Sequence, residues 1–233
     1  MKFKRVILKL SGESLANSNN FGINSENCHK IASMIKNLFD SKMEIGLVIG
    51  AGNFWRGRTG TQISRIKSDK MGILATAMNA LAFSDILNNI GIKTLIQSSI
   101  EIKSIVPAFS VDDTVNALKN NKIVIFSCGI GSPFFSTDTI AALRAAEINA
   151  DIILKATTVD GVYSGDPKIN KNSVKYDKIT FDEILSKNLK VMDMTAISLC
   201  KEASIPILVF KFEDINKIIS SSSSKNQIGT YIY

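Results

Sequence analysis

Two segments decide the fold of this chain: Val6-Ile7-Leu8-Lys9-Leu10-Ser11-Gly12 and Gly50-Ala51-Gly52-Asn53-Phe54-Trp55-Arg56-Gly57. In each, an apolar run breaks into a glycine-containing turn, with a cation at the break or just past it. Apolar runs of this length predict strands buried in a parallel sheet. Backbone N–H groups of a glycine turn close on anions, and Lys or Arg supplies the charge that phosphate requires. No G-x-x-x-x-G-K-[ST] sequence occurs in the chain, so we predict a phosphate site of another kind.

Strand-like runs and helical patterns alternate from end to end. Strands are predicted at Arg5–Leu10, Glu44–Ile49, Lys93–Gln97, Lys122–Ser127, Asp151–Lys155, Pro206–Phe210 and Gly229–Tyr233. Helices are predicted at Ser25–Phe39, Asp69–Asn88, Asp112–Asn120, Thr137–Ala150 and Thr195–Ala203. This alternation predicts an α/β fold with a mainly parallel central sheet covered on both faces. Ligands of such sheets bind beyond the carboxyl ends of the strands, where both glycine turns fall.

The composition is that of an ordinary soluble protein, with 233 residues, 45% of them apolar and 21% charged. The net charge of +7 comes from dispersed lysines, which favours a solvated surface over a specific nucleic-acid site. The apolar stretch after the basic N-terminus ends at Lys9, too early for a secretion signal. The three cysteines have no metal or redox spacing, which favours the cytoplasm. The single histidine is in a polar helical stretch, so catalysis is expected to proceed without histidine.

The segment Met71–Leu87 is apolar nearly all round and is interrupted only by Thr76, Asn79, Ser84 and Asp85. It is shorter than the roughly 20 residues that a membrane span needs, and it contains an acid. We therefore predict no membrane segment, and we favour burial of this helix at a subunit interface.

A third segment, from Ser127 to Asp138, leaves a strand, turns on two glycines and starts a helix with Ser, Thr and Asp. Helix N-termini bind anions, although an ordinary N-cap also explains the hydroxyl residues. The adjacent Phe134 and Phe135 are interpreted either as the wall of a base pocket or as core packing.

A fourth segment, from Leu154 to Pro167, again carries a lysine, Lys155, at the end of an apolar strand. Tyr163 is a candidate to stack on a purine and Asp166 a candidate to accept from ribose hydroxyls. Packing and a turn are the alternatives for these two residues. Together the four segments combine several cations, several N–H-rich turns and few acids, a pattern typical of phosphoryl transfer.

Six ordered motifs carry a resemblance to the bacterial uridylate (UMP) kinases of the amino-acid-kinase superfamily. They are Lys9-Leu10-Ser11-Gly12-Glu13, Gly50-Ala51-Gly52-Asn53, Trp55-Arg56-Gly57, Asp69-Lys70-Met71-Gly72, Pro133-Phe134-Phe135-Ser136-Thr137-Asp138 and Lys155-Ala156-Thr157 through Asp166-Pro167. The resemblance runs nearly end to end and includes Lys190-Val191-Met192-Asp193.

The resemblance implies one amino-acid-kinase domain over residues 1–233, a three-layer α-β-α sandwich that phosphorylates UMP with ATP and Mg²⁺ and assembles as a homohexamer. Residues before about 150 would lie mainly on the UMP and phosphate side, and 150–233 mainly on the ATP side. The implied catalytic residues are Lys9, Arg56, Asp138 and Lys155. The implied ATP-binding residues are Lys9, Leu10, Ser11, Gly12, Gly52, Arg56, Thr157, Tyr163 and Asp166. The implied UMP-binding residues are Ala51, Asp69, Ile130, Gly131, Ser132, Pro133, Phe134, Phe135, Ser136 and Thr137, with Asp69 on the ribose. The resemblance implies no metal ligand from the protein.

The chain departs from the family pattern at three positions of the site, one of which is Ser136, a replacement of threonine that keeps the hydroxyl. Ala51 replaces the middle glycine of the second turn, and Ile130 replaces a threonine, which removes a hydroxyl from the UMP pocket. The alternatives are a sister kinase acting on a carboxylate or carbamate, and a non-catalytic protein that binds a nucleotide or an anion. The Asp69–Met71 and Pro133–Asp138 segments favour the nucleotide as substrate.

Overall fold

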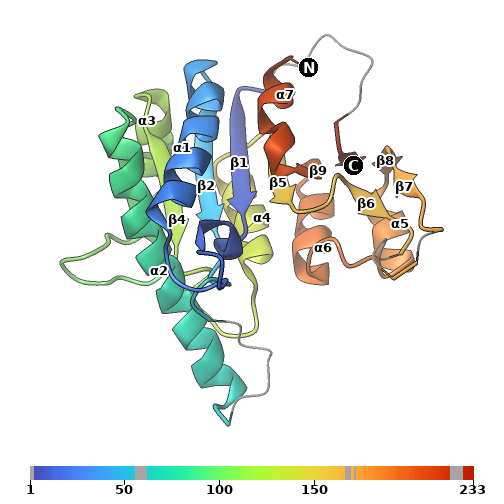
Figure 1. Cartoon of the computed structure of the whole chain (residues 1–233), viewed down its shortest axis with the longest axis horizontal. Helices are drawn as coiled ribbons and strands as arrows, with labels where there is room; N and C mark the ends of the chain where they lie inside the picture. The colour runs from blue at the N-terminus through green and yellow to red at the C-terminus, as the bar shows by residue number, and fades with distance from the viewer. Residues whose placement is uncertain (1–2, 56–61, 166–168, 171, 221–227) are drawn as a thin grey trace.

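A computed structural model describes residues 3–55, 62–165, 169–170, 172–220 and 228–233 of the chain. The fold is a mainly parallel α/β sandwich, as predicted (Figure 1). Its eight-stranded sheet has the order β3-β4-β2-β1-β5-β9-β10-β8. The strands are β1 (Arg5–Leu10), β2 (Glu44–Ile49), β3 (Thr94–Ser98), β4 (Ile123–Ser127), β5 (Ile152–Thr157), β8 (Lys178–Ile179), β9 (Ile207–Lys211) and β10 (Thr230–Ile232). All neighbouring strands are parallel except β9 and β10.

Alternate strand residues face two different helical layers. Val6, Leu8 and Leu10 of β1 pack with α1 (Ser25–Asp40), α2 (Arg65–Asn89) and α7 (Ile215–Ser220). Ile7 of β1 instead faces the layer of α3 (Val111–Lys119), α4 (Thr137–Glu147), α5 (Phe181–Ser186) and α6 (Met194–Glu202). A strand buried on both faces needs an apolar residue at every position, which explains the continuous apolar runs in the sequence.

Short elements complete the fold, and the sequence patterns did not reveal them. They are the 3₁₀ turns η1 (Gly12–Leu15) and η2 (Phe212–Asp214), the helices α5 and α7, the edge strand β8, and the antiparallel pair β6 (Val162–Tyr163) and β7 (Lys175–Tyr176). Two-residue strands and six-residue helices are too short to show a hydrophobic period. The predicted strand and helix bounds are otherwise correct within four residues.

Helix α2 differs from the expected all-round buried helix. Its inner face carries Ala80, Phe83 and Leu87 in the core, but Met71, Leu74, Met78 and Leu81 are each 40–53% exposed on the outer face. By length and composition it is the one helix among the described residues that could cross a membrane, with 44% of its most apolar window buried. Its first turns extend beyond the carboxyl ends of the strands (Figure 1).

Candidate functional site

A cluster of two lysines around one aspartate lies where β1 and β5 end. Lys9 and Lys155 are directly opposite each other in the parallel register of these strands, so their side chains leave the same face of the sheet. Asp138, in the first turn of α4, lies between them. Its Oδ1 is 2.8 Å from the Lys9 Nζ and its Oδ2 is 2.6 Å from the Lys155 Nζ. The parallel pairing, rather than proximity in sequence, brings the three residues together.

The cluster carries one net positive charge in a mostly buried position. Burial raises the pKa of Asp138, but attraction to Lys9 and Lys155 outweighs it, and the net pKa is below its usual value. Burial lowers the pKa of Lys155, repulsion from Lys9 adds to this, and Asp138 opposes it. The aspartate therefore stays ionised at neutral pH and holds two cations close together, which is the arrangement needed to meet a multiply charged anion.

The two glycine turns after β1 and β2 pack directly on each other. A Cβ on Gly12 would lie 2.2 Å from the Gly50 carbonyl oxygen, so this position accepts only glycine. The N–H of Gly50 donates to the Leu10 carbonyl, at 3.0 Å. The N–H groups of Ala51 and Gly52 make no hydrogen bond to any residue that the structure describes. Free backbone donors beside Lys9 are consistent with the predicted anion site.

The start of α4 forms the wall opposite these turns. Ser136 is its N-cap: its hydroxyl accepts from the Asp138 N–H at 3.0 Å and donates to the Asp193 carboxylate. Asp193 also accepts from the Thr139 hydroxyl, at 2.8 Å, and caps α6 through the N–H of Ala196. The N-cap interpretation of Ser136 is therefore correct, and its hydroxyl is engaged within the protein.

A cavity of about 820 Å³ opens beside the cluster. Ala51, Asp69 and the segment Phe134–Asp138 line it together with Lys9. Phe134 is 65% exposed and Phe135 is 47% exposed, so core packing, one of the two interpretations of this pair, is wrong for this chain. The cavity gathers two lysines, one arginine, three aspartates and three aromatic rings in one place.

Asp69 joins two elements that line this cavity. Its Oδ2 accepts from the backbone N–H of Phe134 at 2.8 Å, and its carboxylate pairs with Arg65 of the same helix at 2.7 Å. The Arg65 guanidinium in turn lies 5.4 Å from the centre of the Phe134 ring. Asp69 thus ties α2 to the loop before α4.

The predicted residues Ile130, Gly131, Ser132 and Pro133 do not line the cavity, whereas Gly129 just before them does. The loop turns sharply here, because Cys128, Gly129, Gly131 and Phe134 all have positive φ. Cys128 is buried, as are Cys28 and Cys200, and all three thiols are free.

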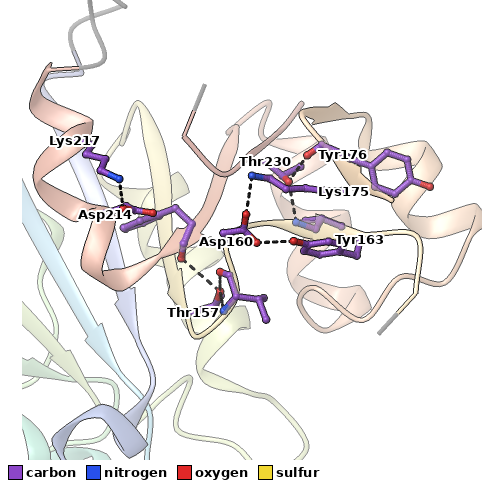
Figure 2. Close-up of polar contacts among 11 residues, drawn as sticks. Thr157, Asp160, Tyr163, Lys175, Tyr176, Asp214, Lys217 and Thr230 are labelled. Carbon is purple, nitrogen blue, oxygen red and sulfur yellow. Dashed lines mark hydrogen bonds and ion pairs between the residues drawn. The ribbon is translucent and has the colours of Figure 1, made fainter. Parts of the chain in front are cut away.

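The predicted ATP-side residues Thr157 and Tyr163 are not among the cavity-lining residues, and each has its own group of polar contacts (Figure 2). The Tyr163 hydroxyl donates to Asp160 Oδ1 at 2.6 Å, and the Lys175 Nζ lies 3.1 Å from Asp160 Oδ2. The Thr157 hydroxyl donates to the Val159 carbonyl at 2.6 Å. These contacts fix the loop after β5 against the β6–β7 pair. Arg56 and Asp166, predicted for catalysis and ATP binding, lie outside the described residues.

Several cavity residues were not among the predicted site residues. Trp55, Arg65, Ser68, Gly72, Ile73, Thr76 and the segment 188–194 also line the cavity. Trp55 and Gly72 were within the quoted motifs, as was Lys190–Asp193, so the resemblance held a usable signal for them. No sequence signal pointed to Arg65 or Thr76 as cavity residues, because their positions depend on how α2 crosses the site.

A parallel sheet whose carboxyl edge carries paired lysines, glycine turns and a helix N-terminus is the arrangement of a phosphoryl-transfer enzyme. The model of the amino acid kinase family matches residues 4–211, and the chain belongs to that family.

The chain is similar along its whole length to solved UMP kinases. It shares 33% identity with UMP kinase from Bacillus anthracis, with a TM-score of 0.93 over 100% of this chain and 96% of that one. It shares 37% identity with UMP kinase from Ureaplasma parvum, with a TM-score of 0.90 over 100% and 99% of the two chains. Uridylate kinase from Archaeoglobus fulgidus is 27% identical, with a TM-score of 0.72 over 98% and 99%.

Proposed function

We propose that this protein transfers the γ-phosphoryl group of ATP to UMP and releases UDP and ADP. The observation that carries the proposal is the Lys9–Asp138–Lys155 cluster beside a cavity lined with aromatic rings. The family membership and the similarity to UMP kinases over the full chain support the same reaction.

In this mechanism an oxygen of the UMP phosphate attacks the γ-phosphorus, and the bond to the ADP oxygen breaks. No general base is required, because the UMP phosphate is already an anion near neutral pH. Lys9 neutralises the transferring group, Lys155 adds a second positive charge, and Asp138 orients both ammonium groups. By resemblance, Arg56 clamps and aligns the phosphates.

We assign UMP to the cavity. Ala51, Asp69 and the segment Phe134–Thr137 line it, and the resemblance adds Ile130–Pro133 as further UMP-binding residues. An exposed phenylalanine pair offers stacking and apolar contact to a base, and the carboxylate of Asp69 offers an acceptor to ribose hydroxyls. These UMP-binding residues all lie before about residue 150, although the segment 188–194 also lines the cavity.

We assign ATP to the part of the chain from about residue 150 to 233, within a single amino-acid-kinase domain. Thr157, Tyr163 and Asp166 hold the nucleotide, while Leu10, Ser11, Gly12 and Gly52 face its phosphates. Mg²⁺ enters with ATP as part of that substrate. Held by phosphate oxygens, it needs no three-carboxylate site, and the described residues contain no group of three or more candidate ligands.

We further propose that the protein works in the cytoplasm, in pyrimidine nucleotide biosynthesis, and self-associates as a homohexamer. The exposed apolar face of α2 supports self-association, because Leu74 and Met78 are each more than half exposed there. Neither a membrane nor a specific nucleic acid is a partner in this proposal.

The test is ADP release from ATP and Mg²⁺ with UMP, CMP, acetylglutamate, aspartate or carbamate as the acceptor, and with no acceptor as control. Turnover with UMP is expected. Turnover only with a carboxylate or carbamate would support a sister kinase of the same fold and overturn the substrate. Nucleotide binding with no turnover on any acceptor would support a non-catalytic binding protein.

A further inference from the structure

Two of the four buried polar residues of α2, Thr76 and Asn79, are three positions apart. Thr76 is 4% exposed and Asn79 is 0% exposed, in a helix that is otherwise apolar over this stretch. Residues three apart share one face of a helix, so both point in the same direction. Buried polar side chains are nearly always hydrogen-bonded, so each of these two residues is expected to have a partner in the structure.

Asn79 holds the turn after β2, residues Gly50–Gly52, which we call the β2 turn. Its Nδ2 donates to the Gly50 carbonyl at 2.8 Å. It also exchanges hydrogen bonds of 2.8 Å with the amide of Asn53, itself 1% exposed. The Gly50 carbonyl is thereby fixed between Asn79 on one side and Gly12 on the other.

This contact decides which way the next N–H points. In a trans peptide the C=O of one residue and the N–H of the next point in opposite directions. With the Gly50 carbonyl held toward α2, the N–H of Ala51 points away from α2, and Ala51 lines the cavity. Asn79 therefore orients a backbone donor of the phosphate site without lining the cavity itself.

Thr76 holds the turn after β4, residues Cys128–Gly131, which we call the β4 turn. Its hydroxyl accepts from the Cys128 N–H at 2.8 Å and donates to the Ile73 carbonyl at 2.6 Å. Cys128 has a φ of 61°, a conformation that a side chain other than glycine rarely adopts, so it needs support from its surroundings. The next residue, Gly129, lines the cavity.

We propose that Asn79 and Thr76 are positioning residues that set the β2 turn and the β4 turn relative to each other through one rigid helix. Asn79 acts on the phosphate side through Gly50, and Thr76 acts on the UMP side through Cys128. This inference rests on the proposed function for the kinetic effect, but the positioning itself does not depend on the identity of the substrate.

Ser84 supplies a matched control on the same helix. It is 8% exposed and its hydroxyl pairs with the Thr94 hydroxyl at 2.6 Å, at the opposite end of β3 from the cavity edge. Ser84→Ala removes a mostly buried hydroxyl of α2 and its hydrogen bonds, as Thr76→Val does, but touches neither turn.

The experiment compares Asn79→Ala, Thr76→Val, Thr76→Ser and Ser84→Ala by steady-state kinetics and by melting temperature. We expect Asn79→Ala to lower kcat about tenfold or more, because a displaced donor misaligns the reacting groups. We expect Thr76→Val to raise the KM for UMP severalfold, with a smaller effect on kcat. Thr76→Ser keeps the hydroxyl and is expected to have the wild-type KM for UMP. Ser84→Ala is expected to lower the melting temperature but to leave kcat and the KM for UMP within about twofold of the wild-type values.

Hydrogen exchange of peptides covering residues 50–55 and 127–131 gives a readout without substrate. Exchange is expected to be faster at 50–55 in Asn79→Ala and at 127–131 in Thr76→Val, and unchanged at both in Ser84→Ala. Kinetic constants and exchange rates that match the Ser84→Ala variant at equal loss of melting temperature would overturn the proposal. If Asn79→Ala does not fold, the comparison of Thr76→Val with Thr76→Ser decides. A wild-type protein inactive on UMP would refute the proposed reaction, whereas the exchange result would still decide the positioning.

Discussion

Lys9 and Lys155 are opposite each other on adjacent parallel strands, and one carboxylate, that of Asp138, contacts both. Two like charges this close repel, so the pair persists because an ionised acid lies between them. The cluster gives the site its excess positive charge while keeping each ammonium group in a fixed direction. Such preorganised charge is what phosphoryl transfer requires of the protein.

The first prediction concerns Lys9. Lys9→Ala is expected to lower kcat by orders of magnitude with little effect on the fold, because it removes the charge that we propose neutralises the transferring group and leaves Asp138 paired with Lys155. Arg56→Ala is expected to have a similar effect. The measurement is ADP release under saturating UMP and ATP, with circular dichroism to confirm folding. Wild-type turnover in either variant would remove that residue from the mechanism.

The second prediction concerns acid stability. The pKa of Asp138 is lower in the folded protein than its ordinary value of 3.8, so its contribution to stability is complete above that pH and is lost as the pH falls through the folded pKa. Asp138→Asn leaves two buried lysines without their acid and is expected to cost about 3 kcal/mol at pH 7. The cost should shrink below about pH 4, where the acid of the unfolded wild-type chain takes up a proton while the folded one still keeps its charge.

Urea unfolding of both proteins between pH 3 and pH 7 measures this. Asp182→Asn is the control, because Asp182 pairs with Lys201 on the surface, where an ion pair contributes little. A constant difference between wild type and Asp138→Asn at every pH would contradict the assigned role of Asp138.

The central strands could be predicted from the sequence because buried parallel strands are continuous apolar runs. β1 and β2 begin and end at the predicted residues. The pairing of Lys9 with Lys155 could not be predicted from periodicity, since it depends on β1 lying between β2 and β5 in the sheet. The exposure of the outer face of α2 could not be predicted from the sequence for a related reason. Met71 and Phe83 are equally apolar in sequence, and only the position of the sheet decides which one is exposed.

The third prediction concerns the contact between the glycine turns. Gly12→Ala would place a Cβ 2.2 Å from the Gly50 carbonyl oxygen, a backbone atom that cannot move aside alone. We expect a lower melting temperature and a loss of kcat, because the N–H groups of the β2 turn shift together. Gly72→Ala is the control for stability. Its Cβ would meet only Trp55, at 4.0 Å, and alanine favours a helix by about 1 kcal/mol over glycine, so its melting temperature should rise. Equal effects of the two substitutions would refute the close-contact argument.

The fourth prediction concerns Asp69. Asp69→Asn is expected mainly to raise the KM for UMP, since the amide loses the charge that pairs with Arg65 and one acceptor for the ribose. Fluorescence of Trp55, the single tryptophan of the chain and a cavity residue, measures UMP binding directly. Asp85→Asn on the same helix, outside the cavity lining, is the control. An unchanged KM and an unchanged UMP titration in Asp69→Asn would contradict the ribose assignment.

The fifth prediction concerns the exposed face of α2. Leu74 is 53% exposed and Met78 is 51% exposed, one helical turn apart, so a charge at either position would be buried in any interface formed there. Leu74→Glu and Met78→Glu are each expected to lower the mass measured by light scattering, because an unpaired carboxylate in an apolar interface is costly. Val174→Glu changes an apolar side chain that is 66% exposed on another part of the surface, and it should leave the mass unchanged. A monomeric wild-type mass would refute the hexamer. An assembly unaffected by both α2 variants would place its interface on a different surface.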